Sequence, residues 1–264
     1  MLIGEHLTYA INHKTLVDDV SLDIAPGEIV GVIGANGAGK STLLKLLVGD
    51  LEPRSGRVAM NNRPLADWGK RERAKTRAVL PQSTSLTFGF SVLEVVLIGR
   101  SPHVHGIERK IDYGIARQAL VATKIDHLAE RIFTTLSGGE KQRVQLARVL
   151  AQIWEGTNAR YLMLDEPTNN LDLAHQHGTL QIARQVAGRG VGILAILHDL
   201  NLAAQYADRI LIMHQGRCLA IGASKDVLTS HNIEAAFSLP VRVEAHPYLN
   251  CPLIIAVPFK MQSN

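Results

Sequence analysis

A glycine-rich stretch near the start of the chain combines a lysine with two hydroxyl side chains. Residues 34–41 read Gly-Ala-Asn-Gly-Ala-Gly-Lys-Ser and match the pattern G-x-x-x-x-G-K-[ST]. In this pattern the glycines turn backbone N–H groups toward phosphate oxygens, while the lysine reaches the β- and γ-phosphates and the serine ligates Mg²⁺. The residues expected to contact a nucleotide here are Gly34, Ala35, Asn36, Gly37, Ala38, Gly39, Lys40, Ser41 and Thr42. An ordinary glycine-rich turn is the alternative, disfavoured by the apolar run before the loop and the helical pattern after it.

Two adjacent carboxylates follow the apolar run 162–164. Asp165 is a candidate partner of Mg²⁺, because a strand that ends in a carboxylate is how a P-loop fold delivers an acid to the metal. Glu166 could polarise a water for in-line attack on the γ-phosphate. A solvated acidic turn would explain the pair taken alone, but the glycine loop elsewhere in the chain disfavours it.

A second anion-binding device lies in the middle of the chain. Residues 136–140 read Leu-Ser-Gly-Gly-Glu and precede a helical pattern over 141–148. Ser137 can cap this helix, and Gly138 and Gly139 leave backbone amides bare at its N-terminus. An ordinary capped helix fits these residues in isolation, but it does not explain their place before the acidic strand of a P-loop protein.

Bulk composition excludes several classes of protein. With 46% hydrophobic and 20% charged residues among 264, a packed core is expected and disorder is not. The net charge of +4 is too weak and too scattered for a nucleic-acid partner. We expect no signal peptide, and no apolar run approaches the ~18 residues of a membrane span. Two cysteines fit a reduced compartment.

The elements that must position these motifs alternate along the chain. Strands are expected over 2–25, 29–33, 56–60, 161–164, 191–197 and 210–213, with a hairpin partner over 218–221. Residues 91–152 have a helical pattern, 71–77 predict an exposed basic helix, and the tail after 223 combines a helix with an apolar end. Apolar strands that alternate with helices predict an α/β fold with a mainly parallel sheet.

The motifs, in this order, resemble the ATP-binding cassette family over almost the whole chain. Gly34–Ser41 is similar to its Walker A loop, Gln82 to its Q-loop glutamine, Leu136–Glu140 to its signature, Leu162–Glu166 to its Walker B strand, Asn169–Asp172 to its D-loop, and His198 to its switch histidine. The resemblance implies a P-loop NTPase fold with a mainly parallel core sheet, an N-terminal antiparallel β part and an inserted α-helical subdomain. It implies a core over 1–84 and 155–222, a helical subdomain over 85–154 and an extension over 223–264.

The resemblance also implies a mechanism. ATP and Mg²⁺ would be bound, with Ser41, Gln82 and Asp165 at the metal. Glu166 would be the general base, His198 would hold the γ-phosphate, and Gln82 would also link to a membrane subunit. A second copy of the chain would form a head-to-tail dimer, in which Ser137, Gly138, Gly139 and Asp172 complete the partner's ATP site. The family stacks adenine on an aromatic residue; spacing points to Ile11, but the nearest aromatic is Tyr9, so this contact stays open.

Three functions are compatible with such a cassette. A soluble ATPase acting on ribosomes or DNA is disfavoured, because this chain has one cassette and no sustained heptads. A non-hydrolysing regulator is disfavoured by the presence of Glu166 and His198. The energy-coupling subunit of a membrane transporter remains, bound peripherally at the cytoplasmic face of the inner membrane to permease subunits and acting indirectly with a periplasmic binding protein.

The cargo follows from a narrower resemblance. The stretches 95–100, 171–175 and 198–204 are most similar to ATPases of bacterial importers of iron chelates, heme and cobalamin. The run 152–159 and the pattern Asp-Leu-Ala-His-Gln-His over 172–177 favour heme within that group. Import of siderophore iron or cobalamin is the alternative. The histidine pairs 103/105 and 175/177 are interpreted as surface residues, because a metal site needs further convergent ligands.

Overall fold

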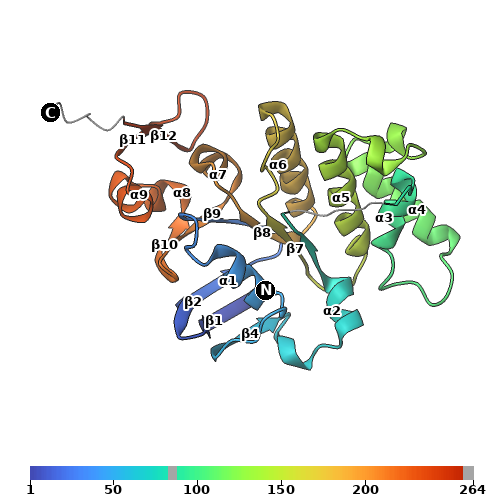
Figure 1. Ribbon diagram of the computed structural model, residues 1–264, viewed down its shortest axis with the longest axis horizontal. Coiled ribbons are helices and arrows are strands. Elements are labelled where there is room, and N and C mark those ends of the chain that lie inside the picture. The colour runs from blue at the N-terminus through green and yellow to red at the C-terminus, as the bar shows by residue number, and fades with distance from the viewer. Residues whose placement is uncertain (83–87, 258–264) are drawn as a thin grey trace.

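The computed structural model describes residues 1–82 and 88–257, which form three sheets with helices around them (Figure 1). The strands are β1 (Leu2–Ile11), β2 (Lys14–Ile24), β3 (Ile29–Ile33), β4 (Ser55–Met60), β5 (Arg63–Pro64), β6 (Arg77–Leu80), β7 (Arg160–Asp165), β8 (Val191–Ile196), β9 (Arg209–His214), β10 (Arg217–Ala223), β11 (Val241–Ala245) and β12 (Pro252–Ala256). The helices are α1 (Lys40–Leu47), α2 (Lys70–Thr76), α3 (Val92–Ile98), α4 (Lys110–Ala122), α5 (Gly138–Gln152), α6 (Leu173–Ala187), α7 (Leu200–Tyr206), α8 (Ser224–Val227) and α9 (Ser230–Phe237).

The central sheet has six strands in the order β10-β9-β3-β8-β7-β6. The pairs β9/β3, β3/β8, β8/β7 and β7/β6 are parallel, and only β10 runs antiparallel to its neighbour. Every residue of β3 and β8 is buried, as expected of strands covered on both faces. The prediction of an α/β fold with a mainly parallel core sheet is confirmed.

A separate antiparallel sheet, in the order β2-β1-β4-β5, carries the N-terminus. Its β1 pairs with β2 from Leu2↔Ile24 onward and with β4 from Leu2↔Met60 onward. Helix α1 lies between this sheet and the core sheet (Figure 1), and one hydrophobic cluster joins all three. The loop before α1 is therefore packed against both sheets.

Helices α3, α4 and α5 form a layer beyond the edge strand β6 (Figure 1). Their core contains a fully buried arginine, Arg100, whose guanidinium donates to Asp112 (3.1 Å), Glu155 (2.7 Å) and the carbonyl oxygen of Ala151 (2.8 Å). A buried cation needs such partners, because an unpaired charge is costly to desolvate. These bonds hold the ends of α3, α4 and α5 together.

The remaining predictions concern where one helix ends and where the domains divide. The basic helix ends at Thr76, and Arg77 begins β6, a strand that the sequence did not indicate. The division into domains stays a prediction, and its boundary at 84/85 and final residues 258–264 lie outside the described residues. In the part of the chain that the structure describes, no helix is long and apolar enough to span a bilayer.

Candidate nucleotide-binding site

The glycine loop connects the end of β3 to the start of α1, as predicted. Lys40 is the first residue of α1, and its side chain is only 6% exposed. Its Nζ donates hydrogen bonds to the carbonyl oxygens of Gly34 (2.7 Å) and Ala35 (3.0 Å). Burial lowers the pKa of Lys40, while the carboxylates of Glu166 and Asp165 act against that shift. The loop therefore holds a desolvated amine, bonded only to neutral acceptors, at its centre.

Two glycines of this loop are required by their surroundings. Gly34 has φ 151° and Gly39 has φ 100°, in a region that disfavours residues with a side chain. A Cβ on Gly34 would lie 2.3 Å from the carbonyl oxygen of Met213, and one on Gly39 would lie 2.3 Å from that of Leu16. The loop backbone is thus pressed against β9 and β2, which sets its curl.

Ser41 and Asp165 come together although they are far apart in the chain. The Ser41 hydroxyl donates to Oδ1 of Asp165 at 3.3 Å. Burial, and then the neighbouring charge of Glu166, raise the pKa of Asp165. A hydroxyl oxygen and a carboxylate oxygen side by side are ligands that Mg²⁺ prefers, and a cation there would stabilise the charged form of Asp165.

Glu166 is the meeting point of three strand ends. Its backbone has φ 52°, so the chain turns sharply after β7. Its Oε1 lies 2.7 Å from Nε2 of His198, which follows β8, and its Oε2 accepts from Nε2 of Gln82, which follows β6, at 2.6 Å. Because parallel strands end at one edge of the sheet, the topology brings these three predicted residues together. Asn169 also donates to Oε2, at 3.2 Å, a contact that the sequence reasoning did not find.

The second anion-binding device is satisfied by its own side chains. Ser137 caps α5, its hydroxyl oxygen accepting from the backbone N–H of Glu140 (3.3 Å) and donating to the Glu140 carboxylate (2.8 Å). The backbone N–H of Ser137 also donates to this carboxylate (2.8 Å), and the bonds from this N–H and from the hydroxyl lower the pKa of Glu140. Helices α1 and α5 belong to different hydrophobic clusters, on opposite faces of the core sheet, and no hydrogen bond among the described residues joins Ser137, Gly138 or Gly139 to the glycine loop. Their contribution to a nucleotide site stays a prediction.

Asp172 lies next to this device through a histidine. Asp172 caps α6 by accepting from the backbone N–H of His175 at 2.8 Å, and its Oδ1 also lies 2.8 Å from Nδ1 of that ring. The ring lies against Gly139, where a Cβ would be 2.4 Å from it. His175 was interpreted from the sequence as a surface residue; its spacing from Asp172, i to i+3, was the available indication of this contact.

The other expected features are also placed. The ring of His103 bonds to the carbonyl oxygen of Gln152 (2.8 Å), and that of His177 bonds to the hydroxyl of Tyr206 (2.9 Å), so both have structural partners. Tyr9 is partly buried against the hydrophobic cluster that joins α1 to the two sheets, whereas Ile11, at the end of β1, is 48% exposed. The residue that packs on adenine stays open between these two.

Comparisons with known proteins agree with this geometry. Residues 17–169 match the sequence model of the ABC transporter family. The chain is 56% identical to the hemin import ATP-binding protein HmuV of Gloeobacter violaceus, over 92% of this chain and 89% of that protein. It is 50% identical to the protein of that name from Pseudomonas aeruginosa, over 97% and 100%.

Among solved structures, the fold is similar to an inward-facing putative metal-chelate type ABC transporter. The TM-score is 0.84 at 30% identity, and the match covers 97% of each chain. A nucleotide-free ATP-binding cassette from an ABC transporter has a TM-score of 0.76, over 90% of this chain and 95% of that one. The chain belongs to the ABC transporter family, as its six motifs predicted.

Proposed function

We propose that this protein is the ATP-hydrolysing, energy-coupling subunit of a bacterial importer of hemin. The observation that carries the hydrolytic part is the convergence of Gln82, Glu166 and His198 beside Lys40 and Asp165. The hemin part rests on the similarity to proteins named for hemin import.

The loop binds the phosphates of ATP. Lys40 exchanges its two neutral carbonyl acceptors for charged phosphate oxygens, and such charge-assisted bonds are about twice as strong. The bare N–H groups at the start of α1 and the hydroxyl of Thr42 add donors. The desolvated amine of Lys40 therefore gains a strong partner when ATP is bound.

Mg²⁺ would be held by Ser41, Asp165 and the side-chain oxygen of Gln82. When bound, the metal neutralises charge on the phosphates. The chain's own contribution is to keep these oxygens together: the Ser41 hydroxyl is already in contact with the Asp165 carboxylate, and Gln82 uses its nitrogen on Glu166, which leaves its oxygen available.

Glu166 acts as the general base toward the attacking water. Gln82 and Asn169 hold Oε2 from one side, so the carboxylate is fixed in orientation. His198 contacts Oε1 and, when its ring is turned to the γ-phosphate, stabilises the charge that develops there. Proton acceptance at Oε1 thus requires His198 to exchange this contact for one with the phosphate.

A second copy of the chain completes each site. Helix α5 presents Ser137, Gly138 and Gly139 at its N-terminus, on the opposite face of the core sheet from α1 and the glycine loop. In a head-to-tail dimer, these amides meet the phosphates held by the partner, and Asp172 lies beside them through its bond to His175.

The membrane partner binds the helical layer next to Gln82. Large apolar side chains are exposed on this layer and on the segments that lead into it: Phe88 (69%), Ile98 (42%), Ile107 (82%) and Ile111 (54%). An apolar surface of this kind marks a binding face. The permease subunits would cover it, placing the protein peripherally at the cytoplasmic face of the inner membrane, with a periplasmic binding protein as an indirect partner.

The cargo is tested by co-purifying the chain with its permease in liposomes and adding loaded binding proteins. A hemin-loaded carrier should stimulate ATP hydrolysis, and a ferric-siderophore or cobalamin carrier should not. The likeness to a metal-chelate type transporter favours siderophore iron as the second candidate. Stimulation by a siderophore carrier alone would replace hemin by that cargo and leave the hydrolytic proposal intact.

A further inference from the structure

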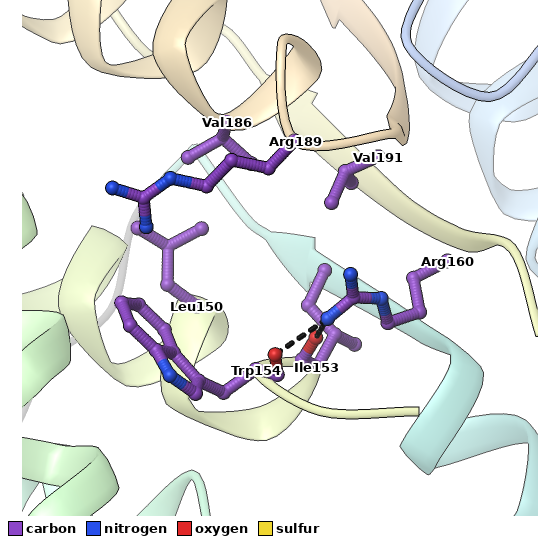
Figure 2. A pocket seen from close by; sticks show the side chains of 7 residues that line it. All are labelled: Leu150, Ile153, Trp154, Arg160, Val186, Arg189 and Val191. Atoms are coloured by element: carbon purple, nitrogen blue, oxygen red, sulfur yellow. Dashed lines mark hydrogen bonds between the residues drawn. The ribbon is translucent and has the colours of Figure 1, made fainter. Parts of the chain in front are cut away.

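A cavity of about 210 Å³ lies at the opposite end of α5 from Ser137 (Figure 2). It is formed where the ends of α5 and α6 meet the starts of β7 and β8, and its lining residues are Leu150, Ile153, Trp154, Arg160, Val186, Arg189 and Val191. The aliphatic members of this lining are almost fully buried. The wall of the cavity is therefore apolar apart from two arginines and one indole.

The two arginines lack carboxylate partners. Arg160 uses Nη1 to donate to the carbonyl oxygens of Ile153 (2.9 Å) and Trp154, at the end of α5. Among the described residues, no carboxylate lies within salt-bridge distance of Arg160 or Arg189, whereas nearby Arg184 pairs with Asp208 at 2.9 Å. Burial lowers the pKa of Arg160, and no acid offsets this cost. The cavity thus presents positive charge that no carboxylate in the described part of the chain neutralises.

Trp154 supplies a flat wall. The Arg189 side chain reaches across the cavity toward Trp154, while Arg160 enters from the other side (Figure 2). The Arg189 Cζ lies 5.7 Å from the centroid of the Trp154 ring, and the indole N–H donates to Gln118 at 2.9 Å. The ring is therefore held in place, with one arginine over its face and another across the cavity.

We propose that this cavity binds a small aromatic carboxylate. A volume near 210 Å³ equals about seven water molecules at ~30 Å³ each, which suits a single ring and is too small for a nucleotide. The ring would pack on Trp154 and the aliphatic side chains, and the carboxylate would accept hydrogen bonds from the free guanidinium nitrogens of Arg160 and from Arg189. Apolar surroundings strengthen such bonds.

Benzoate is the probe, and Trp154 fluorescence is the readout. Trp68→Phe leaves Trp154 as the only tryptophan, and it costs no hydrogen bond because the Trp68 Nε1 has no partner among residues 1–82 and 88–257. We expect saturable quenching by benzoate. Benzyl alcohol, which has the ring without the charge, should bind about tenfold more weakly, and acetate, which has the charge without the ring, should give no response.

Variants locate the ligand. Arg189→Gln, and Arg160→Lys, which keeps the charge but loses the planar fork, should each weaken benzoate about tenfold. Arg117→Gln is the matched control, because Arg117 does not line the cavity: it lines a neighbouring hollow that shares Trp154 and Arg189, and it pairs with Glu130 (3.5 Å). Its benzoate affinity should be unchanged.

Three results would overturn the proposal: a response that does not saturate, equal affinity for benzyl alcohol and benzoate, or a loss in Arg117→Gln as large as that in Arg189→Gln. The cavity lies at the starts of β7 and β8, whereas the glycine loop follows the end of the parallel strand β3, at the opposite edge of the core sheet. ATP affinity measured on the same variants should therefore not change. That measurement separates loss of this site from loss of the nucleotide site.

Discussion

The N-termini of α1 and α5 both present backbone amides to an anion, yet they are built in opposite ways. The loop before α1 is pressed between β9 and β2 and contains a buried cation, Lys40, bonded only to neutral carbonyl oxygens. At α5, the capping box of Ser137 and Glu140 satisfies the helix end with a carboxylate in place of a buried lysine. We propose that the first device holds phosphate with its own residues, and that the second contributes to a phosphate site only together with the glycine loop of a second copy.

Removing Lys40 tests the complete device and should have the largest effect. Lys40→Ala loses two hydrogen bonds to charged oxygens, so ATP affinity should fall about 10²–10⁴-fold and hydrolysis should disappear. Binding of a fluorescent ATP analogue measures this. Lys45→Ala, which removes an exposed lysine of the same helix, is the control and should bind normally. Normal ATP affinity in Lys40→Ala would refute the phosphate cradle.

Glu166→Gln separates chemistry from binding. The amide keeps the shape of the side chain but cannot accept a proton, so hydrolysis should fall at least about 100-fold while ATP binding persists. Size-exclusion chromatography with ATP should then show a trapped dimer. Glu108→Gln is the control, because Glu108 is an exposed acid just before α4. This variant should hydrolyse ATP normally and elute as the wild type does. Near-normal turnover by Glu166→Gln would remove it as the base.

His198→Ala should slow hydrolysis about 10–100-fold with ATP affinity nearly unchanged, because one charge-stabilising contact is lost and the loop is untouched. Single-turnover kinetics measures the chemical step directly. His177→Ala, which loses a contact with Tyr206 away from the site, is the matched control. Equal rates in the two variants would contradict the role of His198.

Gly138→Asp breaks the second device alone. A Cβ at Gly138 meets no atom within 4 Å, so the variant should fold, while its carboxylate repels phosphate at the helix N-terminus. It should bind ATP but not hydrolyse it. Mixed with Lys40→Ala, it should recover roughly a quarter of wild-type activity, because half of the dimers then contain one intact site.

Gly138→Ala is the control for that mixture, and it should remain active because it adds bulk without charge. If the mixture of Gly138→Asp and Lys40→Ala stays inactive although mixed dimers form, the two devices do not act across a dimer. That result would leave phosphate binding by the glycine loop untouched and would remove only the second copy from the mechanism.

Asp165→Asn gives the smallest effect, on stability. Burial and Glu166 raise the pKa of Asp165 above its ordinary value of 3.8, so keeping this acid charged costs the folded state. This loss of stability is absent at pH values below the pKa that Asp165 has in the unfolded chain. It is fully present at pH values above the raised pKa that Asp165 has in the folded protein. At neutral pH without nucleotide, Asp165→Asn should raise the Tm by about 1–3 °C, and the gain should vanish in acid. A lower Tm at pH 7 would contradict it.

Much of the fold could be predicted because its cues are local. The apolar run of β3, the glycines before Lys40 and the cap at Ser137 can each be recognised from a stretch of only a few consecutive residues. By contrast, β6 is short and begins with Arg77, so its strand character comes from pairing with β7 rather than from its own pattern. The contacts of Asn169 with Glu166 and of His175 with Asp172 each span three residues, so their spacing was available in the sequence; the position of His175 against Gly139 comes from packing of α6 beside α5.

The sequence by itself determined which groups are available and in what order: the glycine loop with its lysine, the pair of acids after an apolar strand, and the capped helix. It could do so because residue type and short spacing specify donors, acceptors and helix ends. Only the tertiary structure decided which of these meet. Parallel strands end at one sheet edge, so Gln82, Glu166 and His198 converge across long stretches of chain. Helices α1 and α5 pack on opposite faces of the core sheet: Met163 of β7 faces the cluster of α1, and Leu162 and Leu164 face the cluster of α5 and α6. The sheet therefore separates the two anion-binding helix ends within one chain.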